Sequence, residues 1–258
     1  MKVFQSWPDS PLGNFNYIIV FGSDCYVVDP FDSEKIQREL ESRNLKLIGI
    51  INTHSHWDHV KGNIQLKDIY QCEVICHHKA IDTIPGATKG IRNGDVIEIG
   101  EDKIIFSETP GHIEDHICLF LETSGEIKAV ISGDTLFNAG VGNCRNGGNV
   151  DELYQTFQHH FFQLDDSVVV YPGHDYILNN LKFTLSIEPD NSYASELLYR
   201  LENDVSHEYC TYLTTIGEEK KMNTFFRLNS STIRQKLEKV ASSDKEVFVE
   251  LRSLRDNW

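Results

Sequence analysis

The chain has 258 residues, of which 40% are hydrophobic and 24% are charged. This composition is typical of a globular protein, with enough length for one large domain or for a domain with an appendage. The formal net charge of −15 argues against nucleic acid as a general partner, because binding to phosphates needs a basic face.

The sequence also lacks the signals of export and membrane insertion. No run of 18 apolar residues indicates a membrane span, and the segment from Met1 to Pro8 lacks the apolar core of a signal peptide. Several of the six cysteines lie in apolar, strand-like segments, so we expect buried thiols in a cytoplasmic protein rather than disulfides. The cysteines are Cys25, Cys72, Cys76, Cys118, Cys144 and Cys210.

Strand and helix patterns alternate over roughly the first 175 residues. Residues 17–20 and 25–28 flank a glycine-containing turn and predict a hairpin. Residues 33–43 predict a helix with Asp32 or Ser33 as its N-cap. Strands interleaved with helices and hairpins predict a two-sheet sandwich covered by helices.

The second half of the chain becomes mainly helical. Residues 150–164 predict an amphipathic helix with one apolar face. That face carries Leu153, Phe157, Phe161 and Leu164. Because the strand signal fades from about residue 179, we predict a catalytic domain of residues 1–178 followed by a helical domain of residues 179–258.

The segment from His54 to His59 reads His-Ser-His-Trp-Asp-His and holds four potential metal ligands within six positions. It follows the apolar run 47–51, so the ligands lie where a buried strand gives way to a loop. His54 and His56 are two residues apart and point the same way in an extended segment, whereas Asp58 and His59 follow at a predicted helix start. The two pairs therefore aim differently, which indicates two adjacent metal ions.

Three further potential ligands, His112, Asp134 and His174, each follow a strand-like segment and have a glycine or proline nearby. Such positions bring side chains from separate strands to one edge of a sheet. A single histidine in such a loop is usually a hydrogen-bonded surface residue, but five histidines and two aspartates at four strand ends indicate a metal site. Imidazole and carboxylate groups suit zinc, iron or manganese.

Several strings resemble a known family. The segment Thr53–His59, followed by Gly62 and Asn63, resembles the signature of the metallo-β-lactamase superfamily. Within it, the chain resembles glyoxalase II, the hydroxyacylglutathione hydrolase family, over essentially its full length. The segments that carry this resemblance are Gly133–Phe137, Tyr171–Tyr176, Asn179–Phe183, Asn223–Arg227 and Leu251–Trp258. The resemblance implies a four-layer αββα sandwich with a C-terminal helical subdomain.

The resemblance also implies two divalent metal ions, with zinc expected first and iron or manganese as alternatives. One ion would be held by His54, His56, His112 and Asp134. The other would be held by Asp58, His59, Asp134 and His174. Asp134 would bridge the two, since a carboxylate has two oxygens and can span ions about 3.5–4 Å apart.

The implied reaction is hydrolysis of a thioester. A metal ion lowers the pKa of a bound water to about 7, which provides hydroxide near neutral pH, and it polarises the carbonyl that is attacked. Asp134 and Asp58 are the expected catalytic carboxylates, because Asp134 would bridge the ions and Asp58 would orient the hydroxide or shuttle a proton. The sequence contains no serine elbow motif that would supply a different nucleophile.

The expected substrate-binding residues depart in part from the family pattern. Asn143 and Arg145 stand where the family has a basic residue and an aromatic, so Arg145 would restore the charge from a shifted position. Tyr176 matches a tyrosine that hydrogen-bonds the thiol peptide. Arg252 and Arg255 match basic residues that bind a glycine carboxylate, and their spacing places them on one helix face. Without the resemblance, this arginine pair would be interpreted as a solvated helix end.

A second departure lies between His112 and His116, where the family usually has small residues and a glycine. Glu114 and Asp115 stand there and add negative charge near the expected metals. This added charge puts a preference for an anionic acyl group in doubt. We expect His116 to have a supporting role rather than to be a ligand.

Another cluster, Cys72 and Cys76 with His77 and His78, does not have a standard zinc spacing, so we do not predict a second metal site there.

We therefore predict a monomeric, dinuclear metallohydrolase that cleaves S-acyl thioesters of glutathione, such as S-lactoylglutathione to lactate and glutathione. One alternative is a metallohydrolase that acts on a different thiol ester or on a lactone. Another is a mono-iron oxidoreductase similar to persulfide dioxygenase, which lacks a comparable C-terminal helical region. A non-catalytic binding module is the third, although all seven expected ligands are present.

Overall fold

The computed structural model describes residues 1–7, 10–204 and 212–258, so the predicted thiol Cys210 lies outside the described residues. The chain forms two compact units, each built from three chain segments. Unit 1 consists of Met1–Thr109, Asp115–Gly133 and Pro172–His174. Unit 2 consists of Pro110–Glu114, Asp134–Tyr171 and Asp175–Trp258.

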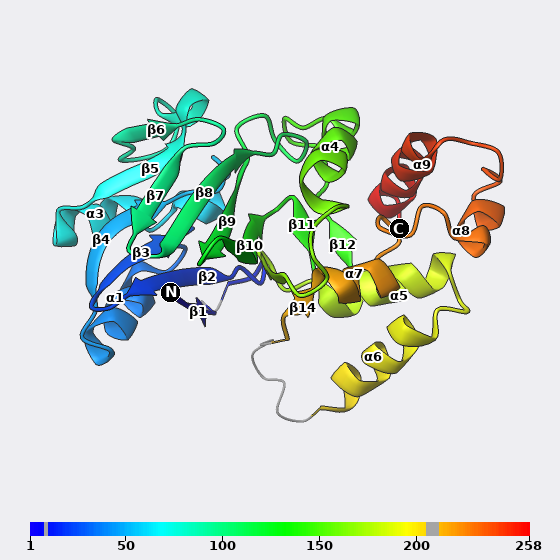
Figure 1. Ribbon diagram of the computed structural model, residues 1–258, viewed down its shortest axis with the longest axis horizontal. Coiled ribbons are helices and arrows are strands. Elements are labelled where there is room, and N and C mark those ends of the chain that lie inside the picture. Colours follow the sequence, from blue (N-terminus) through cyan, green and yellow to red (C-terminus); the bar gives the residue numbers. More distant parts are fainter. Residues whose placement is uncertain (8–9, 205–211) are drawn as a thin grey trace. The chain divides into compact units, whose positions relative to one another are not determined.

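Unit 1 contains a six-stranded mixed sheet with the strand order β1-β2-β3-β4-β5-β6 (Figure 1). Strands β1 to β3 pair antiparallel, and β3 to β6 pair parallel. The hairpin predicted over residues 17–28 is formed by β2 and β3. The strands are β1 (Lys2–Ser6), β2 (Asn16–Phe21), β3 (Asp24–Val28), β4 (Lys46–Ile51), β5 (Glu73–His77) and β6 (Lys89–Ile91).

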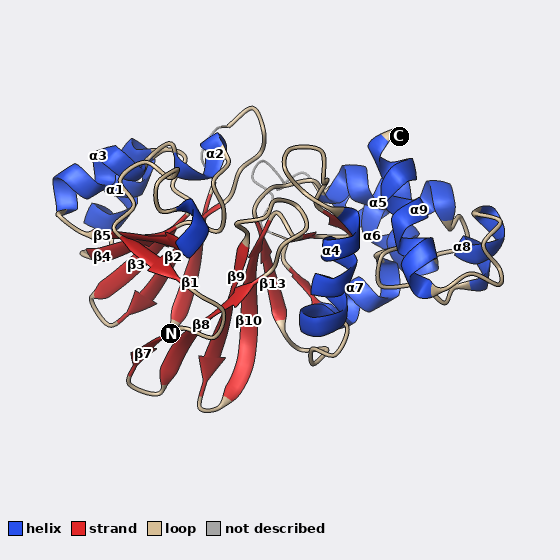
Figure 2. Cartoon of the chain, turned by 90° about the horizontal axis from the view of Figure 1, so that it is seen from above, coloured by secondary structure: helices blue, strands red, loops and turns tan. Residues whose placement is uncertain are grey.

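Two helices cover one face of this sheet (Figure 2). They are α1 (Ser33–Ser42) and α3 (Asn63–Tyr70). The Asp32 side chain accepts a hydrogen bond from the backbone N–H of Lys35 at 2.9 Å, so α1 has one of the two N-caps that the sequence predicted. Ile36, Leu40 and Leu66 are fully buried in one apolar cluster with side chains of β2 to β5. This cluster holds both helices on the sheet.

Unit 1 also contains four antiparallel strands of a second sheet. They are β7 (Val96–Ile99), β8 (Asp102–Glu108), β9 (Ile117–Thr123) and β10 (Glu126–Gly133). Figure 2 shows these strands on the side of the first sheet away from α1 and α3. Ile104 and Phe106 of β8 and Leu121 of β9 are buried and belong to the core. The prediction of two sheets with flanking helices is confirmed.

Unit 2 is mainly helical, as predicted for the C-terminal region. Its core includes Phe157, Phe225 and Phe248, with ring centroids 5.1 Å apart for the last two. Its helices are α4 (Val150–Thr156), α5 (Ile177–Ile187), α6 (Ser192–Asn203), α7 (Ile216–Met222), α8 (Ser231–Lys236) and α9 (Asp244–Asp256). Its short strands are β11 (Leu136–Phe137), β12 (Gly140–Val141) and β14 (Thr214–Thr215), and it holds most of β13 (Val169–Pro172). Within the described ranges, no helix is both long and apolar enough to cross a bilayer.

The helix predicted from residue 150 changes its geometry part-way. After α4 the chain forms a π-helical turn over Phe157–Phe161, in which Phe162 N–H donates to Phe157 O at 3.0 Å. Leu153 and both end residues of that turn are fully buried, as the apolar spacing predicted, whereas Leu164 is half-buried. The prediction of a single α-helix was therefore wrong in detail. The wider turn brings the Phe157 and Phe161 rings together in the core, with centroids 5.0 Å apart and planes tilted by 34°.

The cysteines of the described part are free thiols, which confirms the sequence prediction for them. Cys25, Cys72, Cys76 and Cys118 are buried, and Cys144 is half-buried. Burial raises the pKa of Cys25 to about 12 and that of Cys76 to about 11. Because the thiolate is the reactive form, these two side chains act as packing groups at neutral pH.

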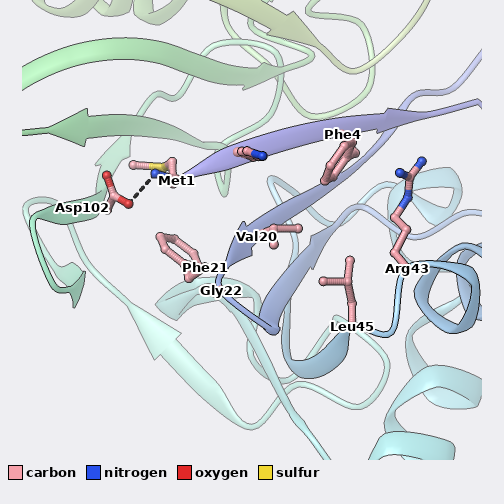
Figure 3. A pocket seen from close by; sticks show the side chains of 9 residues that line it. Met1, Phe4, Val20, Phe21, Gly22, Arg43, Leu45 and Asp102 are labelled. Atoms are coloured by element: carbon pink, nitrogen blue, oxygen red, sulfur yellow. Dashed lines mark hydrogen bonds and ion pairs between the residues drawn. The ribbon is translucent and has the colours of Figure 1, made fainter.

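A cavity of about 440 Å³ lies beside β1 and β2 in unit 1 (Figure 3). Phe4 and Leu45 contribute to its apolar wall, and the Arg43 guanidinium lies 4.3 Å from the centroid of the Phe4 ring. Asp102 is the one carboxylate among the lining residues, and it pairs with the Met1 amino group. The lining holds no cluster of potential metal ligands, so the expected chemistry does not belong to this cavity.

Glu219 of α7 is a buried acid inside unit 2. Burial raises its pKa to about 7, although hydrogen bonds to the carboxylate act in the opposite direction. The Ala139 N–H donates to its two oxygens at 3.0 and 3.1 Å, and the Asn223 amide donates to one of them at 2.7 Å. Protonation of this group is therefore linked to folding.

We expect the free energy of unfolding to fall as pH rises from about 4.5 to about 7, because the folded chain keeps a proton at Glu219 that the unfolded chain has released. The contribution is about 1.4 kcal/mol per unit of pKa difference, so a total of roughly 3–4 kcal/mol is expected. Glu219→Gln should lose less stability across this window in urea unfolding at pH 5.0 and 7.5. Equal losses in both proteins would contradict the assignment.

Candidate metal centre

The cluster of potential ligands spans the end of β4 and the start of α2 (Trp57–Val60). β4 ends at Ile51, and His56 is the N-cap of α2, with extended backbone angles. Asp58 and His59 therefore occupy the first turn of a helix, which confirms the predicted helix start. Both of these side chains are buried.

Asp58, His59 and His174 bring three ligand atoms together in unit 1. His59 Nε2 and His174 Nε2 are 3.2 Å apart, and they lie 3.5 and 3.4 Å from Asp58 Oδ2. Ligand bonds of about 2.0–2.2 Å around one ion separate neighbouring ligand atoms by about 3–3.5 Å. The three residues therefore fit one divalent metal ion.

His54 and His56 form a second pair in unit 1. His54 Nε2 and His56 Nδ1 are 2.9 Å apart, so these two nitrogens face the same point. His54 Nδ1 lies 3.0 Å from the Thr53 hydroxyl, which donates its own proton to Asp29 Oδ2 at 2.6 Å. The hydroxyl therefore accepts from His54 Nδ1–H, and Nε2 keeps its lone pair for a ligand.

Asp29 is a buried residue of this site that the sequence analysis missed. One of its oxygens accepts from Thr53 N–H at 2.8 Å, and the other lies 2.9 Å from His59 Nδ1. A carboxylate behind the ring fixes the tautomer of the imidazole and increases its strength as a ligand. Its place directly after β3, beside Pro30, is the same strand-end signal that marked the ligands themselves.

His174 and Asp58 are held by residues near the N-terminus. The Leu12 carbonyl lies 3.0 Å from His174 Nδ1, and a carbonyl can only accept, so Nδ1 carries the proton and Nε2 the lone pair. Asn14 is almost fully buried, and its side-chain amide donates to Asp58 Oδ2 at 2.9 Å. Neither Leu12 nor Asn14 carries a metal-ligand signal in the sequence, because both act through tertiary contacts.

Unit 2 contains the other two expected ligands, His112 and Asp134. His112 Nε2 lies 3.5 Å from Asp134 Oδ2, again the separation of two ligands of one ion. The Asn143 carbonyl accepts from His112 Nδ1 at 2.6 Å, which fixes the same tautomer as in His174. A Cβ at Gly142 would lie 1.9 Å from the Asp134 carbonyl oxygen, so only glycine fits between these residues.

His77, His78 and Glu108 form another group of potential ligands, but their hydrogen bonds differ. The Lys79 N–H donates to His77 Nδ1 at 3.1 Å, so the proton of the neutral ring is on Nε2, toward Glu108. Arg92 Nη1 lies 3.1 Å from His78 Nε2 and can only donate to it. The lone pairs that a metal would need are engaged, and neither Cys72 nor Cys76 joins a ligand group in the described part of the chain.

His116 packs against one of the expected ligands, His54, and belongs to none of the groups of potential ligands in the described part of the chain. It is fully buried, and its Nδ1 lies 2.9 Å from the Thr109 hydroxyl. Its ring stacks on the His54 ring with centroids 5.0 Å apart. These contacts agree with the expectation that His116 supports a ligand rather than binding a metal itself. Of the two acidic residues that precede it, Asp115 is buried and Glu114 is exposed.

Unit 2 also contains a cavity of about 430 Å³ that gathers all five expected substrate-binding residues. Its lining holds three arginines and one aspartate, so it favours an anionic ligand. The lining residues are Phe137, Val141, Asn143, Arg145, Asn146, Tyr176, Asn180, Arg252, Arg255, Asp256 and Trp258.

The arginines of this cavity have different surroundings. Arg145 is exposed and pairs with Asp256 at 3.6 Å. Arg255 is half-buried, and its guanidinium lies 5.5 and 5.2 Å from the ring centroids of Phe183 and Trp258. Arg252 is 5% exposed, and burial lowers its pKa. Arg255 is therefore the better placed of the two α9 arginines to meet a ligand.

Comparison with known proteins gives the family. A metallo-β-lactamase superfamily model matches residues 10–174, and a model of the hydroxyacylglutathione hydrolase C-terminus matches residues 175–258. A hydroxyacylglutathione hydrolase from Polaromonas sp. (strain JS666) is 39% identical over 100% of both chains. The chain belongs to the hydroxyacylglutathione hydrolase family. A cytoplasmic hydroxyacylglutathione hydrolase from Arabidopsis thaliana is 32% identical over 95% of each chain.

Solved structures share the fold of this hydroxyacylglutathione hydrolase family member. The structure of ETHE1 from Myxococcus xanthus has a TM-score of 0.67 at 23% identity and covers 99% of this chain and 98% of that one. The BLEG-1 B3 metallo-β-lactamase also has a TM-score of 0.67, at 20% identity, and covers 88% of this chain and 100% of that one. These comparisons confirm the predicted superfamily fold with an added helical C-terminal region.

We expect Asn14→Ala to weaken metal binding in this hydroxyacylglutathione hydrolase family member, because it removes the amide that holds Asp58 Oδ2. Loss of such a partner typically costs about 10- to 100-fold in metal affinity. Competition with a chromophoric chelator measures the effect. Asn203→Ala, at the exposed end of α6, is the matched control and should bind metal as the unchanged protein does. Equal metal affinity in all three proteins would show that Asn14 does not support the metal site.

Proposed function

We propose that this chain hydrolyses S-acyl thioesters of glutathione, converting S-lactoylglutathione to lactate and glutathione. The observation that carries the proposal is the Asp58, His59 and His174 cluster, with ligand atoms 3.2–3.5 Å apart. It occurs in a chain that matches full-length proteins named hydroxyacylglutathione hydrolase. The clusters of histidine and aspartate are consistent with a binuclear metal site.

We propose the following ligands for the two ions. His54, His56, His112 and Asp134 would hold one. Asp58, His59, Asp134 and His174 would hold the other, so that Asp134 serves both. The tautomers support this assignment, because His112 and His174 donate Nδ1–H to carbonyls and present Nε2 as a lone pair. Zinc is the first expectation, and the same donors also accept iron or manganese.

When bound, the ions lower the pKa of a water molecule to about 7 and polarise the thioester carbonyl. The chain supplies orientation and proton transfer. Asp58 is held by Asn14 through Oδ2, so its carboxylate is fixed where it can orient the attacking water and accept a proton. Asp29, Leu12 and the Asn143 carbonyl keep the imidazoles from turning.

The cavity of unit 2 is proposed to bind the glutathione portion. Glutathione carries two carboxylates, and charge-assisted hydrogen bonds to guanidinium groups suit them. Arg255 is the proposed carboxylate contact, and Tyr176 is the proposed hydrogen-bond partner of the peptide. Arg145 carries positive charge in the same lining, where Asp256 holds it. Residues 179–258 would thus form the substrate-binding domain, and residues 1–178 the catalytic one.

The oxidoreductase alternative makes a different prediction about metal and oxygen. The match of residues 175–258 to the hydroxyacylglutathione hydrolase C-terminus favours the hydrolase. Consumption of oxygen with glutathione persulfide by a mono-iron protein would favour the oxidoreductase. Assays with other thioesters and with lactones distinguish the remaining hydrolase alternatives.

We expect protein purified without chelators to hold close to two metal ions per chain and to release thiol from S-lactoylglutathione. Elemental analysis measures the first quantity, and a thiol reagent measures the second. Removal of the metal with a chelator should abolish turnover, and readdition should restore it. A constant single ion after reconstitution with excess zinc, iron or manganese would rule out the dinuclear site, and absent thiol release would rule out the substrate.

We expect Asp134→Ala to lose both metal and activity more severely than a change at a ligand of one ion. Its turnover should fall by more than about 100-fold, the upper end of effects seen for residues behind the ligands. His174→Ala is the comparison, because it should affect one ion. Circular dichroism verifies that both variants fold. Near-native metal content in Asp134→Ala would show that it does not bridge.

A further inference from the structure

The turn of residues 141–143 in unit 2 lies against both metal ligands of that unit. The Asn143 carbonyl accepts from His112 Nδ1 at 2.6 Å, and the Gly142 N–H donates to Thr135 O at 3.2 Å. A Cβ added at Gly142 would lie 1.9 Å from the Asp134 carbonyl oxygen and 3.1 Å from His112 Nδ1. The turn is therefore packed closely against both Asp134 and His112.

Arg252 of α9 binds this turn directly. Its Nη1 donates to the Val141 carbonyl at 2.9 Å and to the Gly142 carbonyl at 3.1 Å. Its Nη2 donates to Asp256 Oδ1 at 2.9 Å, one helical turn further along α9. The side chain is 5% exposed, and its guanidinium lies 5.7 Å from the centroid of the Phe225 ring. The guanidinium is thus bound on several sides.

A guanidinium suits this set of contacts through its two Nη groups, although the buried Nε has no hydrogen-bond partner. Its planar fork presents several N–H groups in fixed directions, whereas a lysine offers one compact ammonium on a flexible stem. A buried cation is also costly unless its surroundings compensate it. Asp256 supplies the opposite charge, and the two carbonyls supply the acceptors. Arg255 differs, because its guanidinium contacts aromatic rings and the Asn180 side chain and is half-buried.

We propose that Arg252 is a positioning residue for the metal centre. It fixes the turn of residues 141–143, so that the Asn143 carbonyl holds His112 in the tautomer that presents Nε2. Arg255 then supplies the contact to the substrate carboxylate. The inference rests on the proposed function, and it differs from the substrate contact that the family resemblance implied for Arg252.

The test compares Arg252→Lys with Arg255→Ala in the full-length, metal-loaded protein. Arg252→Lys should lower the affinity for zinc by about 10- to 100-fold in chelator competition, the effect expected for a group that orients a ligand. It should also lower kcat for S-lactoylglutathione while KM changes little. Arg255→Ala should keep the zinc affinity and raise KM by about 10-fold or more. Raised KM with unchanged zinc affinity in Arg252→Lys would overturn the proposal.

A second variant covers the case in which Arg252→Lys does not fold. Asp256→Asn keeps both carbonyl contacts of Arg252 possible but removes the opposite charge, so it should lower zinc affinity in the same direction and by less. Unchanged zinc affinity in Asp256→Asn would also overturn the proposal. The measurement of zinc affinity needs no thioester. Failure of the unchanged protein to cleave S-lactoylglutathione would therefore reject the proposed function without deciding whether Arg252 positions the metal ligand.

Discussion

An oxygen atom behind each of three proposed ligand imidazoles is the constraint on which the proposed site depends. The Leu12 carbonyl stands behind His174, the Asn143 carbonyl behind His112, and the Asp29 carboxylate behind His59. Each lies within 3.0 Å of Nδ1, and each is an acceptor, so the proton stays on Nδ1 and the lone pair on Nε2. The proposed metal centre thus depends on acceptors that are far from the ligands in sequence.

The group formed by His77, His78 and Glu108 shows why this constraint matters. Its ligand atoms are as close together as those of the proposed centre, yet a backbone N–H and an arginine point at the ring nitrogens. Proximity alone therefore does not make a metal site. The direction of the hydrogen bonds separates one cluster from the other.

The C-terminal helix α9 connects binding and metal chemistry within unit 2. Arg255 faces the cavity that gathers the expected substrate-binding residues, while Arg252 is bound to the turn that carries Asn143. Asp256 serves both Arg252 and Arg145, so one carboxylate sets the position of two of the three cavity arginines. The residues proposed to meet the substrate and to position a metal ligand are thus neighbours on a single helix.

The sequence by itself determined the family, the two-sheet fold and the potential ligands, because ligand types at strand ends are local patterns. The hairpin over residues 17–28 and the N-cap of α1 were predictable for the same reason. Sequence did not show that the helix from residue 150 turns into a π-helical turn, nor that Asp29 and Asn14 support the ligands. These features arise from packing and from contacts between residues far apart in the chain. Only the tertiary structure decided that Arg252 is buried against backbone carbonyls while Arg255 is not, since two arginines three positions apart look alike in sequence.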